Sequence, residues 1–374
     1  MNRICLNYLY LSRNHAGGKD QVGLNLIKGF QDIGVAKNIQ VICYDYSVNK
    51  IKELSPDCKI VAIKSHNSKK EVFRLLDLLF KNTFIVPKII SSTRSDVLFH
   101  LSCMNGLCRL PCKVVTIPHD IKAVSHRKLA NVVIPFYKYL IYKFIYYLDF
   151  AFSDAIIAIS NTDKKEISKH YPRFSSKIHR IYNPIMTDCY ECQSKVKKEN
   201  QIIAINLQFH HKNIITLLKA FNIIKDSIPY QLVLVGGIPD RVKYLKEYVE
   251  DNGLNDRVKF TGFLSDDEMV EQLEKSRLYV NPSLYEGFGM TAIEAMLRKV
   301  PTLVAGIPTN REVTKGLANY YFPPENEQSL SAMILKTLSF PSSEARLEEI
   351  SNTLKSAYNY KTISQEYYDY FNKI

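Results

Sequence analysis

The stretch that decides the fold reads Asn281-Pro-Ser-Leu-Tyr-Glu286-Gly287-Phe288-Gly289-Met290-Thr-Ala-Ile-Glu294-Ala-Met296. A short apolar run, residues 278–281, predicts a strand, and a helix is expected over residues 291–298. The glycine-containing loop between them leaves backbone N–H groups and the positive end of the helix available to an anion. Glu286 precedes the turn and Glu294 lies in the second helical turn, so two carboxylates can flank a bound phosphate. Carboxylates also accept hydrogen bonds from neighbouring sugar hydroxyls.

Outward from this stretch, short β-branched runs alternate with longer amphipathic segments, which predicts an α/β fold with parallel sheets covered by helices. We expect strands at 4–11, 39–44, 59–63, 97–100, 113–117, 155–160, 201–207, 230–235, 258–261, 278–281 and 302–305. Helices are expected at 20–33, 161–170, 213–226, 241–252, 265–275 and 291–298. In the helix at 265–275, Ser265 and Glu268 have the spacing of a capping box.

A polar segment, residues 187–200, follows Asn183-Pro184 and has no apolar periodicity. It predicts a boundary between an N-terminal domain of residues 1–185 and a C-terminal domain of residues 186–357. The last segment, residues 358–374, is rich in Tyr and Phe and is expected to form a helix that packs back on the body and crosses to the N-terminal domain.

The length of 374 residues, with 46% hydrophobic and 23% charged residues, fits two compact domains and excludes fibrous and low-complexity classes. The net charge of +13 is uneven: residues 1–185 hold 28 basic and 13 acidic residues, whereas residues 186–374 hold 22 and 24. The basic half favours an anionic partner, such as a phosphorylated substrate, a lipid surface or a nucleic acid. A nucleic-acid-binding protein is a remote alternative, because no zinc finger, aromatic RNA-binding motif or basic recognition helix is present.

The eight cysteines are too sparse for a disulfide scaffold and fit a reducing compartment. Cys189 and Cys192 form an isolated C-x-x-C pair, and Cys103, Cys108 and Cys112 match no usual zinc spacing, so we expect no metal site. The N-terminus has no signal-like cleavage site, which predicts a cytoplasmic protein.

The most apolar region, residues 129–152, is interrupted by Lys138, Lys143 and Asp149, so its continuous apolar stretches fall short of the roughly 20 residues that a membrane span needs. Residues 136–150 nevertheless contain eight aromatic side chains, and two basic residues lie just upstream. Two interpretations are open: a helix buried against its own sheet, or a helix that lies at a membrane interface. The basic charge favours peripheral association with anionic lipid.

The run from residue 281 to 296 resembles the E-x7-E signature of retaining glycosyltransferases of family 4, in its mannosyltransferase-like branch. The similarity continues through residues 299–305 to Arg311-Glu312-Val313. It implies the GT-B fold, in which two Rossmann-like domains face each other across a cleft. It also implies that Glu286 contacts the donor sugar and Glu294 the ribose, with Gly287, Phe288, Gly289 and Met290 in the donor-binding loop. Thr291 stands where the family usually has Pro, and the first helical turn tolerates either.

Two further segments of the second half resemble this family. Residues 206–213 are similar to its diphosphate-binding stretch ending in Lys-Asn, which implies that Lys212 binds the diphosphate; a lysine at a helix N-terminus is otherwise unfavourable. The family's nearby arginine is absent, and Gln208, His210 or His211 stands in its place. Thr261-Gly262-Phe263-Leu264 resembles the turn in which backbone groups near Leu264 contact the nucleobase.

In the first half, His119-Asp120 follows an expected strand and resembles the His-Asp pair of the mannosyltransferase-like branch. This implies that His119 lines the sugar pocket and that Asp120 orients it. Gly17 and Gly18 resemble the family's glycine pair, whose backbone amides approach the donor phosphate and the acceptor because glycine has no Cβ.

The resemblance implies a retaining, metal-independent glycosyltransferase without a cofactor, with Glu286, His119 and Lys212 as catalytic residues. The donor would be a nucleoside-diphosphate sugar, and the acceptor a saccharide, linked to a polyprenyl diphosphate, in bacterial O-antigen, capsule or other surface polysaccharide synthesis. The protein would work without nucleic acid, in the cytoplasm and peripherally on the inner face of the membrane. A nucleotide-sugar epimerase or a phosphorylase of the same fold is the alternative, because fold alone does not settle function.

Overall fold

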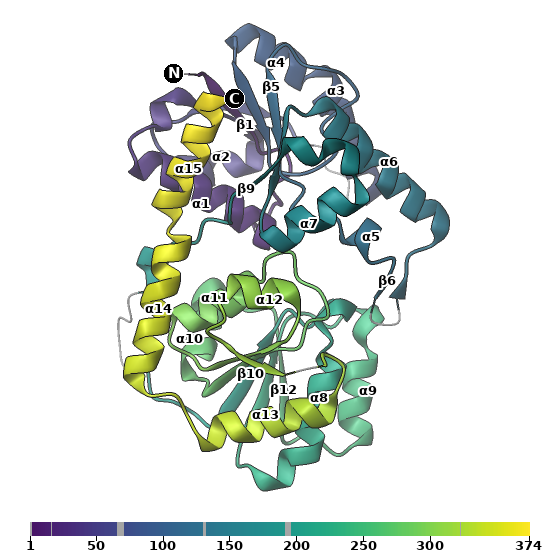
Figure 1. Cartoon of the computed structure of the whole chain (residues 1–374), viewed down its shortest axis with the longest axis vertical. Helices are drawn as coiled ribbons and strands as arrows, with labels where there is room; N and C mark the ends of the chain where they lie inside the picture. Colours follow the sequence, from purple (N-terminus) through teal and green to yellow (C-terminus); the bar gives the residue numbers. More distant parts are fainter. Residues whose placement is uncertain (1, 16, 66–70, 130–131, 191–195, 322) are drawn as a thin grey trace. The chain divides into compact units, whose positions relative to one another are not determined.

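The computed structural model describes residues 2–15, 17–65, 71–129, 132–190, 196–321 and 323–374 and divides into two compact units (Figure 1). Unit 1 comprises Met1–Arg127, Ile134–Met186 and Tyr358–Ile374. Unit 2 comprises Lys128–Val133 and Thr187–Ala357. Each unit has its own parallel sheet, so the predicted α/β fold is confirmed.

The sheet of unit 1 has seven parallel strands, in the order β3-β2-β1-β4-β5-β8-β9. Their bounds are β1 Ile4–Asn7, β2 Ile39–Tyr44, β3 Lys59–Ile63, β4 Val97–His100, β5 Lys113–Thr116, β8 Ala155–Ala158 and β9 Ile178–Arg180. The helices are α1 Gly18–Asp32, α2 Val48–Leu54, α3 Glu71–Phe84, α4 Val86–Thr93, α5 Lys122–Ser125, α6 Phe136–Phe152, α7 Asn161–His170 and α15 Tyr360–Lys373. The strands β1, β4 and β8 are buried throughout, as expected of a parallel sheet covered on both faces.

The sheet of unit 2 has six parallel strands, in the order β12-β11-β10-β13-β14-β15. Their bounds are β10 Gln201–Ile205, β11 Gln231–Val235, β12 Val258–Gly262, β13 Leu278–Asn281, β14 Thr302–Ala305 and β15 Asn319–Tyr321. The helices are α8 Ile214–Ile224, α9 Tyr244–Asp251, α10 Asp266–Lys275, α11 Met290–Leu297, α12 Pro308–Val313, α13 Glu327–Ser339 and α14 Glu344–Tyr358. A short hairpin, β6 Lys128–Leu129 and β7 Val132–Val133, also belongs to this unit.

Both sheets reverse their strand order at the centre, between β1 and β4 in unit 1 and between β10 and β13 in unit 2. Loops that leave neighbouring strands at such a point run to opposite faces of the sheet and leave room for a ligand at the carboxyl ends of the strands. The loops after β10 and β13 carry residues 206–213 and 282–289, which include most of the residues expected to bind a donor.

The C-terminal helix packs back on the body, as predicted. The segment 358–374 forms the helix α15, and Asn359 separates α15 from α14 by accepting hydrogen bonds from the N–H groups of Lys361 and Thr362. Within unit 1, α15 lies against α1, where a Cβ on Gly29 would come 2.0 Å from Oγ of Ser364. Glycine at position 29 is therefore required for this close contact.

The first expected strand, 4–11, ends earlier than predicted. The strand β1 stops at Asn7, and the next four residues turn, with the N–H of Leu11 donating to the carbonyl of Tyr8 at 3.1 Å. Tyr8, Leu9 and Leu11 are buried but do not extend the strand. The apolar run in the sequence reflects this burial, and it was therefore mistaken for a longer strand.

Candidate functional site

The loops after β10 and β13 in unit 2 are joined by hydrogen bonds. Asn213 is buried in a left-handed conformation, φ +53°, and its Nδ2 donates to the carbonyls of Pro282 and Pro324, both at 3.2 Å. The backbone N–H of Leu284 donates to the carbonyl of His211 at 2.9 Å. These bonds fix the positions of Lys212 on one loop and Glu286 on the other.

Lys212 and Glu286 form a buried ion pair. Nζ of Lys212 donates to Oε1 of Glu286 at 2.7 Å, and Nδ2 of Asn281 donates to the same oxygen at 3.2 Å. Burial alone would raise the pKa of Glu286, but the charge and hydrogen bond of Lys212 outweigh it and hold that pKa below its ordinary value. The site therefore holds a carboxylate and an ammonium group in direct contact.

The loop after β13 reaches the helix α11 through Gly289, whose φ of +82° favours glycine. Asn310, on α12, lies beside it: its Oδ1 would be 3.5 Å from a Cβ on Gly289. That oxygen is buried and has no hydrogen-bond partner among the described residues, while Nδ2 of Asn310 donates to the carbonyl of Ala305 at 2.9 Å. In the first turn of α11 the N–H of Ala292 donates to the carbonyl of Gly289 at 3.1 Å. The first two amides of α11 have no acceptor within the helix, and together with Oδ1 of Asn310 they are available to a ligand.

Glu294 lies on α11, one turn further along. Burial raises the pKa of its carboxyl to about 7, with Arg298 opposing and Asp266 adding to the shift. Below it, the hydroxyl of the buried Tyr279 donates to Oγ1 of Thr291 at 2.9 Å. The structure thus provides a second carboxyl group, close to the point of ionisation at neutral pH.

The other predicted residues of unit 2 lie around this centre. Gly287 and Met290 are half-buried in the loop and at the start of α11, whereas Phe288 is buried. His211 is half-buried, and its ring is tilted by 33° to that of Phe209 with 5.5 Å between centroids. Leu264 follows β12, which is separated from β10 by β11 in the sheet.

In unit 1, His119 follows β5 in a left-handed conformation, φ +64°, which is uncommon for histidine. Its Nε2 lies 2.7 Å from the carbonyl oxygen of Leu101. Because a carbonyl only accepts, Nε2 carries the proton and Nδ1 is an acceptor. Burial, with a smaller effect of Lys19, lowers the pKa of His119 to about 3, so the ring is neutral at pH 7. The Leu101 carbonyl orients the ring, whereas the Asp120 carboxylate accepts from the N–H of Lys122 at 3.0 Å.

Gly17 and Gly18 open the helix α1 after the loop that follows β1. Gly17 has a φ of +108°, which side chains with a Cβ rarely adopt, and Gly18 is the first helical residue. Asp20 closes this loop by accepting hydrogen bonds from the hydroxyl and the N–H of Ser12. Burial raises the pKa of Asp20. The contact between Ser12 and Asp20 was not predicted from the sequence. It holds the loop that carries the glycine pair.

A layer of buried polar residues beneath the loops of unit 1 was not predicted. Asn7 donates through Nδ2 to Oδ1 of Asn82 at 2.7 Å and approaches Nδ1 of His100 at 3.0 Å. Asp149, on α6, accepts from the N–H groups of Met104 and Asn105 at 2.8 and 2.9 Å. Burial raises the pKa of Asp149 to about 6. The sequence signal was Asp149 itself, an acid in an otherwise apolar run.

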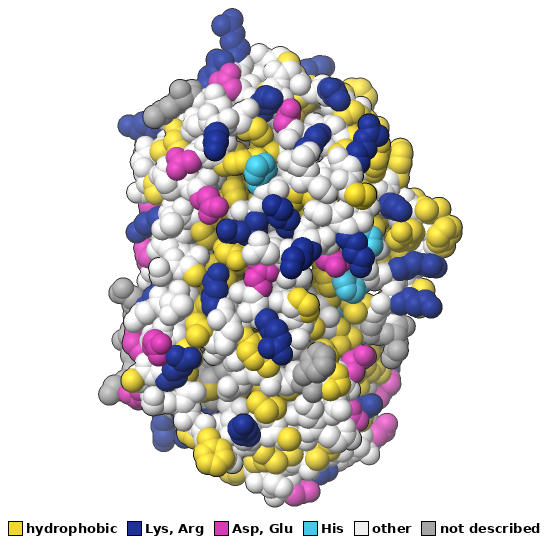
Figure 2. Space-filling model, in the orientation of Figure 1, with side chains coloured by type: hydrophobic (Ala, Val, Ile, Leu, Met, Phe, Trp, Pro, Cys, Tyr) yellow, Lys and Arg dark blue, Asp and Glu magenta, His cyan; other side chains and the backbone are white. Residues whose placement is uncertain are grey.

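The aromatic helix α6 is buried against unit 1 on one side only: Phe150 belongs to a core cluster, and Tyr139 and Tyr146 pack partly buried against it. Phe136, Tyr137 and Phe144 have exposed fractions of 59%, 62% and 61%, and only Asp149 and Phe150 of α6 are fully buried. The helix α3 also exposes an apolar stripe, formed by Phe73, Leu76, Phe80 and Phe84. In Figure 2 hydrophobic side chains gather where Figure 1 draws α6, next to Lys and Arg. Within the described part of the chain, no helix has the length and apolar character needed to cross a membrane.

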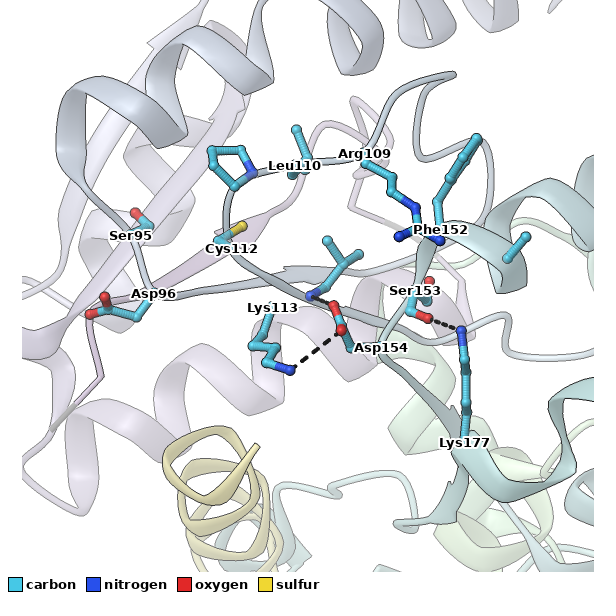
Figure 3. A pocket seen from close by; sticks show the side chains of 13 residues that line it. Ser95, Asp96, Arg109, Leu110, Cys112, Lys113, Phe152, Ser153, Asp154 and Lys177 are labelled. Atoms are coloured by element: carbon cyan, nitrogen blue, oxygen red, sulfur yellow. Dashed lines mark hydrogen bonds and ion pairs between the residues drawn. The ribbon is translucent and has the colours of Figure 1, made fainter.

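A cavity of about 490 Å³ opens at the amino ends of β4, β5 and β8 (Figure 3). Both lysines that line it have partners: Lys113 lies 3.5 Å from Asp154, and Nζ of Lys177 donates to the carbonyl of Ser153 at 2.6 Å. The cavity lies at the opposite edge of the sheet from His119, and no predicted site residue lines it. Among the described residues, no group of three or more His, Cys, Asp or Glu side chains is placed to hold a metal ion. Cys192, the second cysteine of the C-x-x-C pair, lies outside the described residues.

Comparisons with known proteins agree with this arrangement. Residues 17–188 match Glycosyltransferase Family 4, and residues 191–353 match the family Glycosyl transferases group 1. The O-antigen chain mannosyltransferase RfbU of Salmonella typhimurium is 32% identical over 210 residues, which are 56% of this chain and 57% of that protein. The serotype-specific mannosyltransferase WbdA of Escherichia coli is 27% identical over 205 residues, 51% of this chain and 25% of that protein.

The chain thus matches little more than half of RfbU and a quarter of WbdA. Among solved structures, Anabaena Alr3699/HepE in complex with UDP and glucose superposes with a TM-score of 0.76 at 16% identity, covering 100% of both chains. At this identity the likeness concerns the fold alone. The family matches cover both halves of the chain, each unit has its own parallel sheet, and the fold is shared with the solved structure of Alr3699/HepE. The chain therefore belongs to the family 4 glycosyltransferases with the GT-B fold.

Proposed function

We propose that this chain is a retaining glycosyltransferase that moves a sugar from a nucleoside-diphosphate sugar to a saccharide of a bacterial surface polysaccharide such as O-antigen. The observation that carries the proposal is the buried pair of Lys212 and Glu286 beside Gly289, at the switch point of the unit 2 sheet. We propose mannose as the sugar, because RfbU and WbdA are both named mannosyltransferases.

The donor would bind through the loops of unit 2. Its diphosphate would take the hydrogen bond of Lys212 away from Glu286, and the released carboxylate would accept hydrogen bonds from sugar hydroxyls. Glu294 would accept from the ribose hydroxyls. The side-chain carbonyl of Asn310, which has no hydrogen-bond partner among the described residues, and the first amides of α11 are available to the diphosphate-sugar.

In the proposed reaction the oxygen of the acceptor hydroxyl forms a bond to the anomeric carbon on the face from which the diphosphate leaves. The bond between that carbon and the diphosphate oxygen breaks, and the hydroxyl proton passes to the leaving oxygen. No protein base is needed. Lys212 and the amides near Gly289 would stabilise the leaving charge, so we propose that no metal ion or cofactor takes part. His119, neutral and with Nδ1 as an acceptor, would bind a sugar hydroxyl.

The acceptor is proposed to be a saccharide linked to a lipid diphosphate at the cytoplasmic face of the membrane. The exposed aromatic side chains of α6 lie among the exposed Lys138 and Lys143, and unit 1 holds most of the basic excess of the chain. Apolar side chains that enter the interface and cations that meet anionic headgroups are the two contributions that hold a protein on such a surface.

The direct test is a thermal-shift panel of UDP, GDP, ADP and dTDP. A ligand that binds only the folded state raises its melting temperature. One nucleotide is expected to stabilise the wild type and to have no effect on Lys212→Met, compared with that variant's own melting temperature. Lys219→Met, an exposed lysine on α8, is the matched control and should respond like the wild type.

If no nucleotide stabilises the wild type and an oligonucleotide does, the proposal is wrong and the basic half binds nucleic acid. With a nucleotide identified, transfer to a lipid-linked saccharide can be followed, and the anomeric configuration of the product decides retention. Inversion at the anomeric carbon would exclude the same-face mechanism.

A further inference from the structure

Phe263 is the most exposed large hydrophobic residue of the described chain, with 79% of its surface accessible. It follows β12 directly, at the carboxyl edge of the unit 2 sheet. Isolated exposed hydrophobic residues are common on protein surfaces and need no explanation. The surroundings of this ring are what distinguish it.

The ring of Phe263 lies on a glycine. A Cβ added to Gly237 would come 2.5 Å from Cε2 and 2.8 Å from Cζ of Phe263, so the ring packs where a side chain would otherwise stand. With its high exposure, Phe263 keeps one side against the backbone of Gly237 and presents the remainder to solvent. An aromatic ring held in this way offers a flat apolar surface for stacking.

Glycines form the backbone next to the ring. Gly236, with φ +133°, donates its N–H to the carbonyl of Gly262 at 2.9 Å and so joins the ends of β11 and β12. Beside Gly236, Oε1 of Gln208 is buried and has no hydrogen-bond partner among the described residues. A Cβ on Gly236 would lie 2.5 Å from that oxygen. Glycine at position 236 therefore leaves room for the amide of Gln208, whose oxygen is an acceptor without a partner among the described residues, next to the glycine on which Phe263 packs.

The position of this surface fits the donor proposed above. Lys212 follows β10, and β12 is two strands away in the order β12-β11-β10-β13. Two inter-strand spacings are about 10 Å. A nucleotide whose diphosphate contacts Lys212 can extend along the carboxyl edge of the sheet and bring its base to Phe263.

We propose that the Phe263 side chain stacks on the nucleobase of the donor and supplies a large part of the affinity for the nucleotide. The inference rests on the proposed function, and it adds a side-chain contact to a turn for which only backbone contacts near Leu264 are expected. Stacking accepts any base, so Phe263 would set the strength of nucleotide binding, while hydrogen-bonding groups such as Gln208 would choose between bases.

The first test compares Phe263→Ala with Phe340→Ala. Phe340 has the same exposure, 78%, lies in the same unit and follows α13, so it controls for the loss of an exposed ring. Phe263→Ala should weaken the binding of the preferred nucleoside diphosphate by about five- to hundredfold and leave inorganic pyrophosphate binding unchanged. In transfer assays KM for the donor should rise while kcat stays close to the wild-type value. Phe263→Tyr should restore the affinity.

The second test uses the absence of tryptophan from the sequence. Phe263→Trp places a single tryptophan at the proposed stacking surface, and Phe340→Trp places one at the control position. A stacked base should quench the emission of the tryptophan in the Phe263→Trp variant on addition of the nucleoside diphosphate, whereas pyrophosphate should not. The emission of the control variant should stay constant with both.

The outcomes separate this inference from the proposed function. If Phe263→Ala binds the nucleotide as tightly as the wild type, while Lys212→Met does not bind it, the stacking inference is overturned and the donor site stands. If wild type and all variants bind no nucleotide, the proposed function fails and the inference fails with it. Equal quenching by nucleotide and pyrophosphate would also overturn stacking.

Discussion

In unit 2, Nζ of Lys212 lies 2.7 Å from Oε1 of Glu286, and both side chains are largely buried. The two residues are 74 positions apart and leave different strands of the sheet. The ion pair therefore joins the two loops that would hold a donor. A diphosphate that competes for Lys212 would change the partner of Glu286 at the same time, which couples diphosphate binding to recognition of the sugar.

Lys212→Met should lower the free energy of unfolding by about 3 kcal/mol, because a buried carboxylate loses its partner. The double variant Lys212→Met/Glu286→Gln should recover most of this loss, since no buried charge then remains, while transfer activity stays absent. Denaturant unfolding of the two variants measures the difference. Equal stability of the wild type and Lys212→Met would mean that the pair contributes nothing in solution.

Glu294 should make nucleotide binding depend on pH. Its folded pKa of about 7 lies above the ordinary value, so the carboxyl is protonated below neutrality and ionised above it. A carboxylate accepts hydrogen bonds more strongly than a carboxylic acid. The affinity for the nucleotide should therefore rise as the pH increases through about 7, and Glu294→Gln should flatten that part of the profile.

Calorimetric titrations of both proteins at about pH 6, 7 and 8 test this prediction. The phosphate of the ligand titrates in the same range and affects both proteins alike, so the ratio of their affinities is the informative quantity. A ratio that does not change with pH would exclude ionisation of Glu294 as the cause.

How much the sequence could predict depended on whether the signal was local. Glu286, Gly289 and Glu294 lie within one strand, loop and helix, and the capping box of Ser265 and Glu268 is formed as its spacing indicated. Strands 39–44 and 278–281 were predicted to the residue, because buried parallel strands read as short apolar runs. Local patterns were sufficient for the fold and for the centre of the candidate site.

The supporting contacts could not be predicted in this way. Asn213 and Asn310 contribute to the site only because the sheet brings together loops that are distant in sequence. Their residue type is common in ordinary loops and carries no signal by itself. The exposure of α6 was equally hidden, because a helix that is apolar nearly all round gives no periodicity from which to infer its buried face. Only the packing shows which of its residues meet water.

Asp149 should make unit 1 less stable as the pH rises. Its pKa of about 6 in the folded state exceeds the ordinary 3.8, so the folded protein binds the proton more tightly than the unfolded chain. The stabilisation that Asp149 contributes is present below about pH 4 and is lost as the pH rises to about 6. This loss lowers the free energy of unfolding by about 2–3 kcal/mol. Carboxylates whose pKa is lowered in the folded state make the protein more stable as the pH rises. Both the wild type and Asp149→Asn contain these carboxylates, so their effect cancels when the two proteins are compared.

The measurement is the difference in unfolding free energy between the wild type and Asp149→Asn at about pH 4, 5, 6 and 7. The wild type should lose its advantage as the pH rises. A difference that stays constant over this range would show that Asp149 does not titrate there.

His119→Asn should keep the backbone conformation but transfer poorly. Asparagine tolerates the left-handed conformation at this position, but its shorter side chain ends near the place of Nδ1 and cannot donate to the Leu101 carbonyl as Nε2 does. Without this hydrogen bond and the ring, the acceptor that would meet a sugar hydroxyl is no longer held in place, so kcat/KM should fall by at least about tenfold. His119→Val should instead lower the melting temperature, because a β-branched residue is strained at φ +64°. Full activity of His119→Asn would remove His119 from the site.

Membrane binding should depend on the exposed aromatic side chains of α6. The triple variant Phe136→Ser/Tyr137→Ser/Phe144→Ser removes apolar area that is already in contact with water, so it should fold normally while binding to anionic vesicles falls by at least about tenfold. Replacing Lys138 and Lys143 by Gln should weaken binding by about fivefold for each lysine, and should reduce its salt dependence. Phe340→Ser, an exposed ring in unit 2, is the control and should bind like the wild type. Co-sedimentation with vesicles of neutral and anionic phospholipid decides the matter: equal binding to both, or binding that the triple variant retains, would exclude α6 as the membrane-contacting surface.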